Sequence, residues 1–201
     1  MKMSTVTFSY YLAIWACLIG FCYYALIAYS AASGTQIHCD DSKNWPQTKI
    51  NTLIQNKNRY TLVTFIHPYC PCSRASLNEL NKIMTRTHNC MDCKVVFLKP
   101  SVFGANWEKS DLWQISTEIP NSERTSDVDG QLAKSFNATT SGQTFLYDPD
   151  GKLVFSGGVT AARGHEGDSP GGITIESLSS KKKVNSRCSQ VFGCPLFENK
   201  I

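Results

Sequence analysis

Charged side chains are missing from one long stretch near the N-terminus. Residues 5–35 contain no Asp, Glu, Lys or Arg, and residues 10–32 are mostly apolar or aromatic. This composition excludes an ordinary surface helix of a soluble protein, and the stretch is long enough to cross a bilayer core, which takes about 20 residues. We therefore expect residues 1–33 to form an uncleaved transmembrane anchor, with residues 6–32 in the membrane. A cleaved signal peptide is the alternative, because small residues near positions 28–32 have cleavage-type spacing.

The orientation of this stretch follows from one basic residue. Lys2 precedes it, so the positive-inside bias places the N-terminus in the cytoplasm and the remaining chain outside. An anchor and a signal peptide both export residues 33–201. The expected location is the cell inner membrane, crossed once, with the C-terminal domain in the periplasm or another extracytoplasmic space.

Long basic runs, nucleotide-binding motifs and internal repeats are also absent. The formal net charge is +4, and no aromatic residue interrupts the one basic run, Lys181–Lys183. A run of this kind is typical of a solvated face, so we expect no nucleic-acid partner. The sequence also implies no organic cofactor.

Cysteine, in contrast, is abundant. Two of the nine cysteines, Cys17 and Cys22, lie in the apolar stretch and are expected to be small apolar filler. The exported part contains the other seven, and an exported domain so rich in cysteine forms disulfides or works with them. Because seven is odd, at least one thiol is free, metal-bound or intermolecular. The seven are Cys39, Cys70, Cys72, Cys90, Cys93, Cys188 and Cys194.

Hydrophobic periodicity predicts alternating strands and helices. We expect residues 34–45 to be a linker and residues 46–201 to form one α/β domain with a mixed sheet. The expected strands cover residues 60–66, 94–99, 143–147 and 152–156, the helices residues 46–56, 72–86, 131–136 and 173–178, and a short helix falls within 107–115. Turns are expected at residues 127–130 and 148–151.

The motif Cys70-Pro71-Cys72 lies between an apolar strand and a helix. At a helix N-terminus, unpaired backbone N–H groups and the helix dipole stabilise a thiolate. Arg74 favours the same charge, and His67 could add charge or move a proton. The pattern indicates a redox-active or metal-binding thiol.

At this point the chain resembles the thioredoxin-like superfamily, in particular the membrane-anchored, extracytoplasmic thiol–disulfide oxidoreductases, and within them the RedB-like group. The resemblance covers roughly residues 45–196. It rests on the segments 67–76, 140–148, 157–168 and 191–196. It implies a thioredoxin-like fold, with a mixed central sheet flanked by helices.

The resemblance also assigns roles and shows three departures. It implies that Cys70 is the attacking cysteine, whereas the usual resolving position, three residues on, is Ser73. Cys72 is then the expected resolving thiol, and its tight ring with Cys70 would make a strained, oxidising disulfide. Gly142 stands where related proteins carry a cis-proline, and Thr64 where many carry a buried acid.

Two function classes follow from these residues. The first is a thiol–disulfide oxidoreductase acting on protein thiols and disulfides, with catalytic Cys70, Cys72, His67 and Arg74. The alternative is a copper(I)-binding assembly factor, because thiolates suit Cu(I), with Cys70, Cys72 and either His165 or His67 as ligands. A peroxide-reducing variant and a non-catalytic scaffold are weaker possibilities.

A polar, glycine-rich loop at residues 163–168 could carry part of the function. The ordinary interpretation is a solvated turn with a salt bridge. The resemblance instead favours a substrate-binding role. The substrate-binding candidates are Ser141, Gly142, Arg163, His165 and Asp168.

The remaining cysteines are expected to be structural. Cys90 and Cys93 are too far from Cys70 to share a zinc site, since a helix rising about 1.5 Å per residue separates them. A local Cys90–Cys93 disulfide is therefore expected. Cys188 and Cys194 are expected to pair with each other or with Cys39.

Overall fold

The computed structural model describes residues 5–34, 44–46 and 53–197. The chain forms two units, residues 1–32 and residues 33–201. Most of the predicted linker at 34–45 and of the predicted helix at 46–56 lies outside the described residues, as do Lys2 and Cys39.

The first unit is a single helix, α1 (Thr5–Ala31). Its segment Val6–Ala31 has a mean hydropathy of 1.9, and by length and composition it could cross a membrane. Large apolar side chains all along it are exposed, among them Trp15 and Phe21. The expected apolar stretch is therefore one helix, as an anchor or a signal sequence would be.

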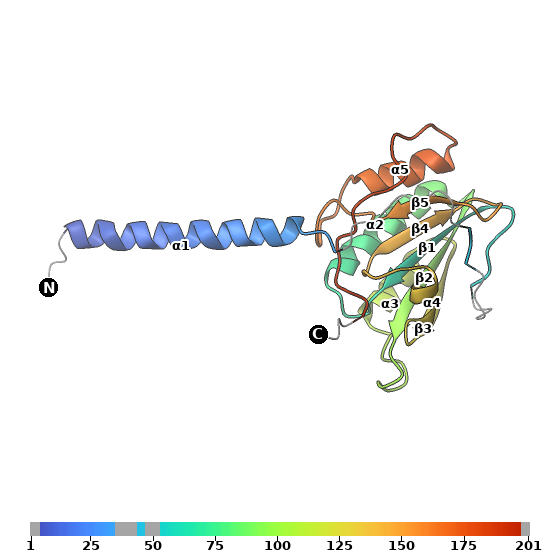
Figure 1. Ribbon diagram of the computed structural model, residues 1–201, viewed down its shortest axis with the longest axis horizontal. Helices are drawn as coiled ribbons and strands as arrows, with labels where there is room; N and C mark the ends of the chain where they lie inside the picture. Colours follow the sequence, from blue (N-terminus) through green and yellow to red (C-terminus); the bar gives the residue numbers. More distant parts are fainter. Residues whose placement is uncertain (1–4, 35–43, 47–52, 198–201) are drawn as a thin grey trace. The chain divides into compact units, whose positions relative to one another are not determined.

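The second unit is built on one mixed, five-stranded sheet (Figure 1). Its order is β3-β2-β1-β4-β5, in which β1, β2 and β3 are parallel, whereas β4 and β5 are antiparallel to their neighbours. The strands are β1 (Tyr60–Ile66), β2 (Met91–Lys99), β3 (Ser122–Val128), β4 (Gln143–Tyr147) and β5 (Leu153–Gly157). β1 and β2 are buried on both faces, which explains why apolar residues such as Leu62-Val63 and Val95–Leu98 follow one another without alternation.

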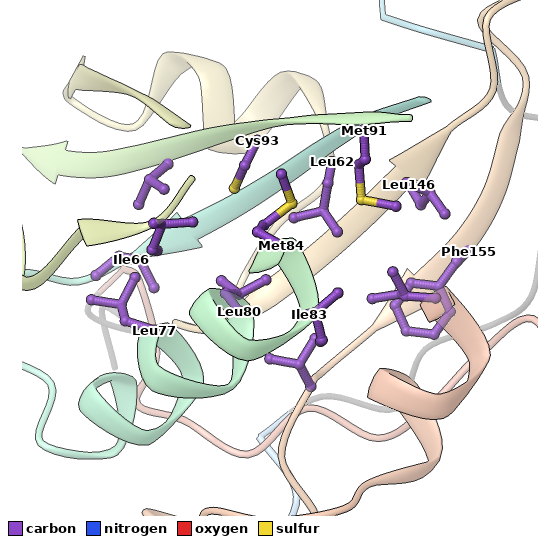
Figure 2. Close-up of a cluster of buried hydrophobic side chains, with 14 of the residues drawn as sticks. Leu62, Ile66, Leu77, Leu80, Ile83, Met84, Met91, Cys93, Leu146 and Phe155 are labelled. Atoms are coloured by element: carbon purple, nitrogen blue, oxygen red, sulfur yellow. The ribbon is translucent and has the colours of Figure 1, made fainter. Parts of the chain in front are cut away.

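Helices cover both faces of this sheet. They are α2 (Cys72–Thr87), α3 (Asp111–Ile115), the short 3₁₀ helix η1 (Ser116–Glu118), α4 (Gln131–Ser135) and α5 (Pro170–Ser179). Figure 2 shows α2 laying Leu77, Leu80 and Ile83 toward the sheet, where Leu62 and Phe155 meet them. A second cluster, which includes aromatic residues, fills the opposite face beside α4. The packing of α2 fixes its first turn, and so Cys72, relative to the end of β1.

The polar segment 122–128 differs from the prediction. No strand was expected there, and a turn was expected at 127–130, yet β3 runs through Val128 at the edge of the sheet. Its side chains are mostly half-buried or exposed, so no apolar alternation marks it. Asp127 is buried because its carboxylate accepts the backbone N–H groups of Leu132 and Ala133 at the start of α4. The turn itself begins at Asp129.

Candidate active site

The junction of β1 and α2 places Cys70 at a helix N-terminus, as the sequence predicts. The backbone turns there through hydrogen bonds from Cys70 N to His67 O (3.1 Å) and from Ser73 N to Cys70 O (3.0 Å). Pro71 already has helical backbone angles, φ −59° and ψ −33°. The Cys70 thiol is almost fully buried, and the backbone N–H of Cys72 in the first turn hydrogen-bonds it.

Cys194 lies against Cys70, although sequence separates them by 124 residues. The Cys194 backbone N–H donates to Cys70 Sγ at 3.4 Å, and the Cys194 side chain hydrogen-bonds it as well. Cys194 is a free, half-buried thiol. The expectation that it pairs with Cys188 or Cys39 is therefore wrong in this structure, in which Cys188 is disulfide-bonded.

Two backbone hydrogen bonds hold the Cys194 segment in place. Ser141 N donates to Cys194 O, and Leu196 N donates to Thr139 O, both at 2.8 Å, so residues 194–196 run along the chain just before β4. Gly193 permits this approach, because a Cβ at that position would lie 1.9 Å from Ser141 O. The sequence did not predict that Cys194 lies beside Cys70, although the odd number of cysteines indicated a free thiol.

The three thiols of the site have different acidities. The pKa of Cys70 is lowered overall. Burial alone would raise it, but the thiolate is stabilised more strongly by hydrogen bonds from the Cys194 thiol, Ser73 and the backbone N–H groups of Cys194 and Cys72. Burial and the nearby Cys70 charge raise the pKa of Cys72, against the opposing effect of Arg163. Burial, followed by the interactions with Cys70, raises the pKa of Cys194 to about 12. Cys70 is the thiol that ionises most readily.

Arg163 connects this site to the 163–168 loop. Its Nη1 donates to Gly193 O at 2.7 Å, and its guanidinium hydrogen-bonds Cys72. The loop is fastened to α2, where Glu79 Oε1 accepts the Gly167 N–H at 2.8 Å. Arg163 is therefore the substrate-binding candidate on this loop whose side chain contacts one of the thiols, that of Cys72.

His165 and Asp168 lie on the same loop with exposed side chains. Among residues 5–34, 44–46 and 53–197, no three or more His, Cys, Asp or Glu side chains are arranged to hold a metal ion. The expected ligand set Cys70, Cys72 and His165 is thus not assembled in this conformation.

Ser141 and Gly142 use their backbone N–H groups within the fold. Ser141 N binds Cys194 O, and Gly142 N donates to Phe65 O at 2.7 Å. Gly142 has φ +88°, and an added Cβ would lie 2.9 Å from Ser76 Oγ, so glycine suits this position sterically. The backbone N–H groups of these two predicted substrate-binding residues are therefore already hydrogen-bonded within the protein.

Ser141 also links the junction through its side chain. Its Oγ accepts the His67 backbone N–H at 2.7 Å and lies 2.7 Å from Ser73 Oγ. Ser73 thus stands where the resemblance expects the resolving cysteine, and its hydroxyl also hydrogen-bonds Cys70. The position of the buried acid is Thr64, whose hydroxyl accepts from Thr144 at 3.0 Å.

His67 and Arg74 lie beside the thiols with other partners. The His67 imidazole accepts the Tyr69 N–H at 3.2 Å and packs edge-on against Trp107, and burial lowers its pKa. Arg74 forms a salt bridge with Asp111. With Cys70, Arg74 and Asp111 line a cavity of about 310 Å³. These contacts make His67 a neutral imidazole at pH 7 and Arg74 a cavity-lining cation.

Cys90 and Cys93 do not form the expected disulfide. Both are free, and they occupy different environments. Cys93 points from β2 into the core (Figure 2), whereas Cys90 donates to Thr87 O at 3.3 Å at the end of α2. Short spacing in sequence suggested the pair, but the start of β2 sends the second thiol into the interior.

Comparison with known proteins relates the chain to solved structures. No family model and no curated protein matches it. An uncharacterized conserved protein from Geobacillus kaustophilus is similar with a TM-score of 0.60 and 13% identity, over 84% of this chain and 96% of that chain. A hypothetical protein from Sinorhizobium meliloti gives a TM-score of 0.57 and 19% identity, over 70% and 80%.

Similar structures with lower scores include thioredoxin-like proteins. The exposed lipoprotein thioredoxin of Streptococcus pneumoniae has a TM-score of 0.45 and 19% identity, over 62% of this chain and 86% of that chain. Identities this low relate folds rather than activities. The predicted mixed central sheet flanked by helices is confirmed in the second unit.

Proposed function

We propose that this chain is a membrane-anchored, extracytoplasmic thiol–disulfide oxidoreductase in which Cys70 attacks the substrate disulfide. One observation carries the proposal: hydrogen bonds to Cys70 lower its pKa although its thiol is buried. A buried thiol without such support would have a raised pKa and would be inert. Two further free thiols, Cys72 and Cys194, lie next to Cys70.

The reaction begins with the Cys70 thiolate. It attacks one sulfur of a substrate disulfide, forms a mixed disulfide and releases the other sulfur as a thiolate, which takes up a proton. A second thiol of the protein then attacks Cys70 and frees the substrate. The sequence assigns this second step to Cys72, whose raised pKa keeps it protonated until Cys70 loses its charge.

The surrounding residues have supporting roles in this proposal. Arg163 holds the Cys72 thiol and the Gly193 carbonyl together. His67, neutral at pH 7, could pass a proton at the edge of the site but adds no charge there. Arg74 presents a cation in the cavity beside Cys70. Protein thiols and disulfides are the proposed substrates.

The proposed location follows from α1. Its length and lack of charge suit an anchor in the cell inner membrane, with the domain in the periplasm or an equivalent space, where disulfides persist. The resemblance of residues 67–76, 140–148, 157–168 and 191–196 supports membership of the RedB-like group. Within that proposal, the Cys-Pro-Cys motif is the reactive part of the site.

Copper(I) binding is the second candidate function. Thiolates are soft ligands, and Cys194 adds a third sulfur beside Cys70 and Cys72 that the sequence-based ligand set lacked. Copper would require the three side chains to regroup, because the described residues present no ready three-ligand site.

A redox titration of the full chain in detergent separates the two functions. Metal-free protein is equilibrated in glutathione buffers, free thiols are alkylated, and Cys70 is followed by peptide mass mapping. We expect reversible oxidation of Cys70, which Cys70→Ser abolishes. Cys90→Ser, which removes a free, half-buried thiol at the far end of α2, should leave the titration unchanged. Cys70 that stays reduced in every buffer, together with stoichiometric Cu(I) uptake, would favour the copper candidate.

A further inference from the structure

We propose that Cys194 resolves the mixed disulfide on Cys70, so that the redox disulfide of this site is Cys70–Cys194. This inference rests on the proposed oxidoreductase function and gives it a second catalytic thiol. It replaces the role expected for Cys72. Three features of the structure support it: the placement of Cys194, the geometry of the Cys-Pro-Cys turn, and the burial of the three cysteine residues.

The placement of Cys194 is set by its backbone. Its carbonyl accepts the Ser141 N–H at 2.8 Å while its own N–H donates to Cys70 Sγ at 3.4 Å. The carbonyl of Gly193 is held separately by Arg163 at 2.7 Å. A backbone fixed on both sides of the thiol keeps Cys194 within reach of Cys70, as an intramolecular reaction requires.

The Cys-Pro-Cys turn is a poorer route to a disulfide. Cys72 also hydrogen-bonds Cys70, so proximity alone does not decide between the two thiols. However, Cys72 is the first residue of α2, Pro71 before it already has helical backbone angles, and a disulfide requires a specific geometry of its own. Closing a Cys70–Cys72 ring would disturb the first turn of α2. The residue that faces Cys70 across this turn is Ser73, which has no thiol.

The burial of the three cysteine residues points the same way. Cys70 and Cys72 are buried, whereas Cys194 is half-buried. A redox disulfide must be reset by an external thiol or disulfide that reaches one of its sulfurs. Cys194 is the more exposed of the two candidate resolving residues, whereas Cys72 is buried and its thiol hydrogen-bonds Arg163.

The resolving step balances without any further reactant. The Cys194 thiol gives its proton to the departing substrate sulfur, its sulfur bonds to Cys70 Sγ, and the bond between Cys70 and the substrate breaks. Cys70 and Cys194 are together oxidised by two electrons, and the substrate disulfide is reduced to two thiols. The mixed disulfide also removes the Cys70 charge, which is one cause of the raised pKa of Cys194, so the resolving thiol becomes more acidic when it is needed.

Peptide mapping can identify the disulfide directly. Trypsin releases residues 60–74, which contain Cys70 and Cys72, and residues 188–200, which contain Cys188 and Cys194. The full chain in detergent is oxidised with glutathione disulfide, alkylated and digested without reductant. We expect the two peptides to be cross-linked, with fragmentation placing the bond at Cys70 and Cys194.

Three variants make the outcome decisive. Cys72→Ser should keep the cross-link. Cys194→Ser and Cys194→Ala both retain the backbone N–H at Cys70, and each should leave Cys70 as a glutathione mixed disulfide that resolves at least about tenfold more slowly. Two substitutions are used so that a folding defect of one, seen in its thermal unfolding, does not decide the question.

The results also separate this inference from the proposed function. If Cys72→Ser abolishes the intramolecular disulfide while both Cys194 variants keep it, Cys72 is the resolving thiol and the inference is overturned, but the oxidoreductase stands. If Cys70 is never oxidised in the wild-type chain, the proposed function fails and the inference fails with it.

Discussion

At the scale of single residues, environment decides what each cysteine can do. Cys70 and Cys93 are both buried, yet their pKa values move in opposite directions. Hydrogen bonds from Cys194 and from Ser73 and Cys72 in the first turn of α2 support the charge of Cys70. Cys93 sits among apolar side chains, and burial raises its pKa to about 12. The first thiol is suited to chemistry and the second to packing.

Cys93 makes stability dependent on alkaline pH. Its pKa is near 9 when unfolded and about 12 in the folded chain, so above pH 9 the unfolded state loses a proton that the folded state keeps. The free energy of unfolding should therefore fall by about 1.4 kcal/mol per pH unit between pH 9 and 12 from this residue. Cys93→Ala should cost about 1 kcal/mol at pH 7, and its deficit should vanish near pH 10. Denaturant unfolding under reducing conditions at several pH values measures this.

Val95 provides the matched control for this experiment. It is fully buried in the same cluster and the same strand but does not titrate. Val95→Ala should lower the free energy of unfolding by a constant amount at every pH. A Cys93→Ala deficit that also stays constant from pH 7 to pH 11 would contradict the assigned ionisation.

At the scale of elements, the sequence predicts the strands and helices whose buried residues form a recognisable apolar pattern. β1 and β2 contain consecutive apolar residues because both faces are covered, and α2 shows apolar residues at helical spacing. Asp148 signals the turn between β4 and β5, where it accepts from Asp150 N and Lys152 N. β3 leaves no such pattern, because an edge strand needs little apolar surface and pairs mainly through its backbone.

The segment carrying Cys194 depends on a close backbone contact at Gly193. Gly193→Ala places a methyl group where Ser141 O now lies, so the segment must move away from the chain before β4. We expect a loss of about 1–3 kcal/mol in the free energy of unfolding, as overpacking usually costs. We also expect less Cys70–Cys194 disulfide at equal glutathione disulfide, measured by the same peptide mapping.

Gly104→Ala is the matched control, since nothing lies within 4 Å of a Cβ at that position. It should change neither stability nor disulfide formation by more than the error of the measurement. Equal behaviour of the two alanine variants would show that the contact between Gly193 and Ser141 does not hold Cys194 in place.

At the scale of the whole molecule, the limit of sequence reasoning is long-range contact. The Cys70 motif, its strand and its helix are neighbours in sequence, so local patterns predict them together. Cys194 reaches the same site from 124 residues away, because its segment hydrogen-bonds Ser141 and Thr139, and no spacing rule encodes these contacts. The sequence shows which residues the segment contains, but only the folded structure shows which residues they contact.

The apolar helix α1 should decide where the whole chain resides. If it is an uncleaved anchor, the intact mass should include residue 1, and the chain should stay with membranes in alkaline carbonate. Leu18→Arg combined with Ile19→Arg places two charges at the middle of Val6–Ala31, each costing about 2.5–3.5 kcal/mol of insertion free energy, and should release the chain. Ile173→Arg, at an exposed position of α5, is the control and should leave membrane retention unchanged. A mature protein that begins near residue 33 would instead identify α1 as a signal peptide, and the thiol chemistry would then belong to a released domain.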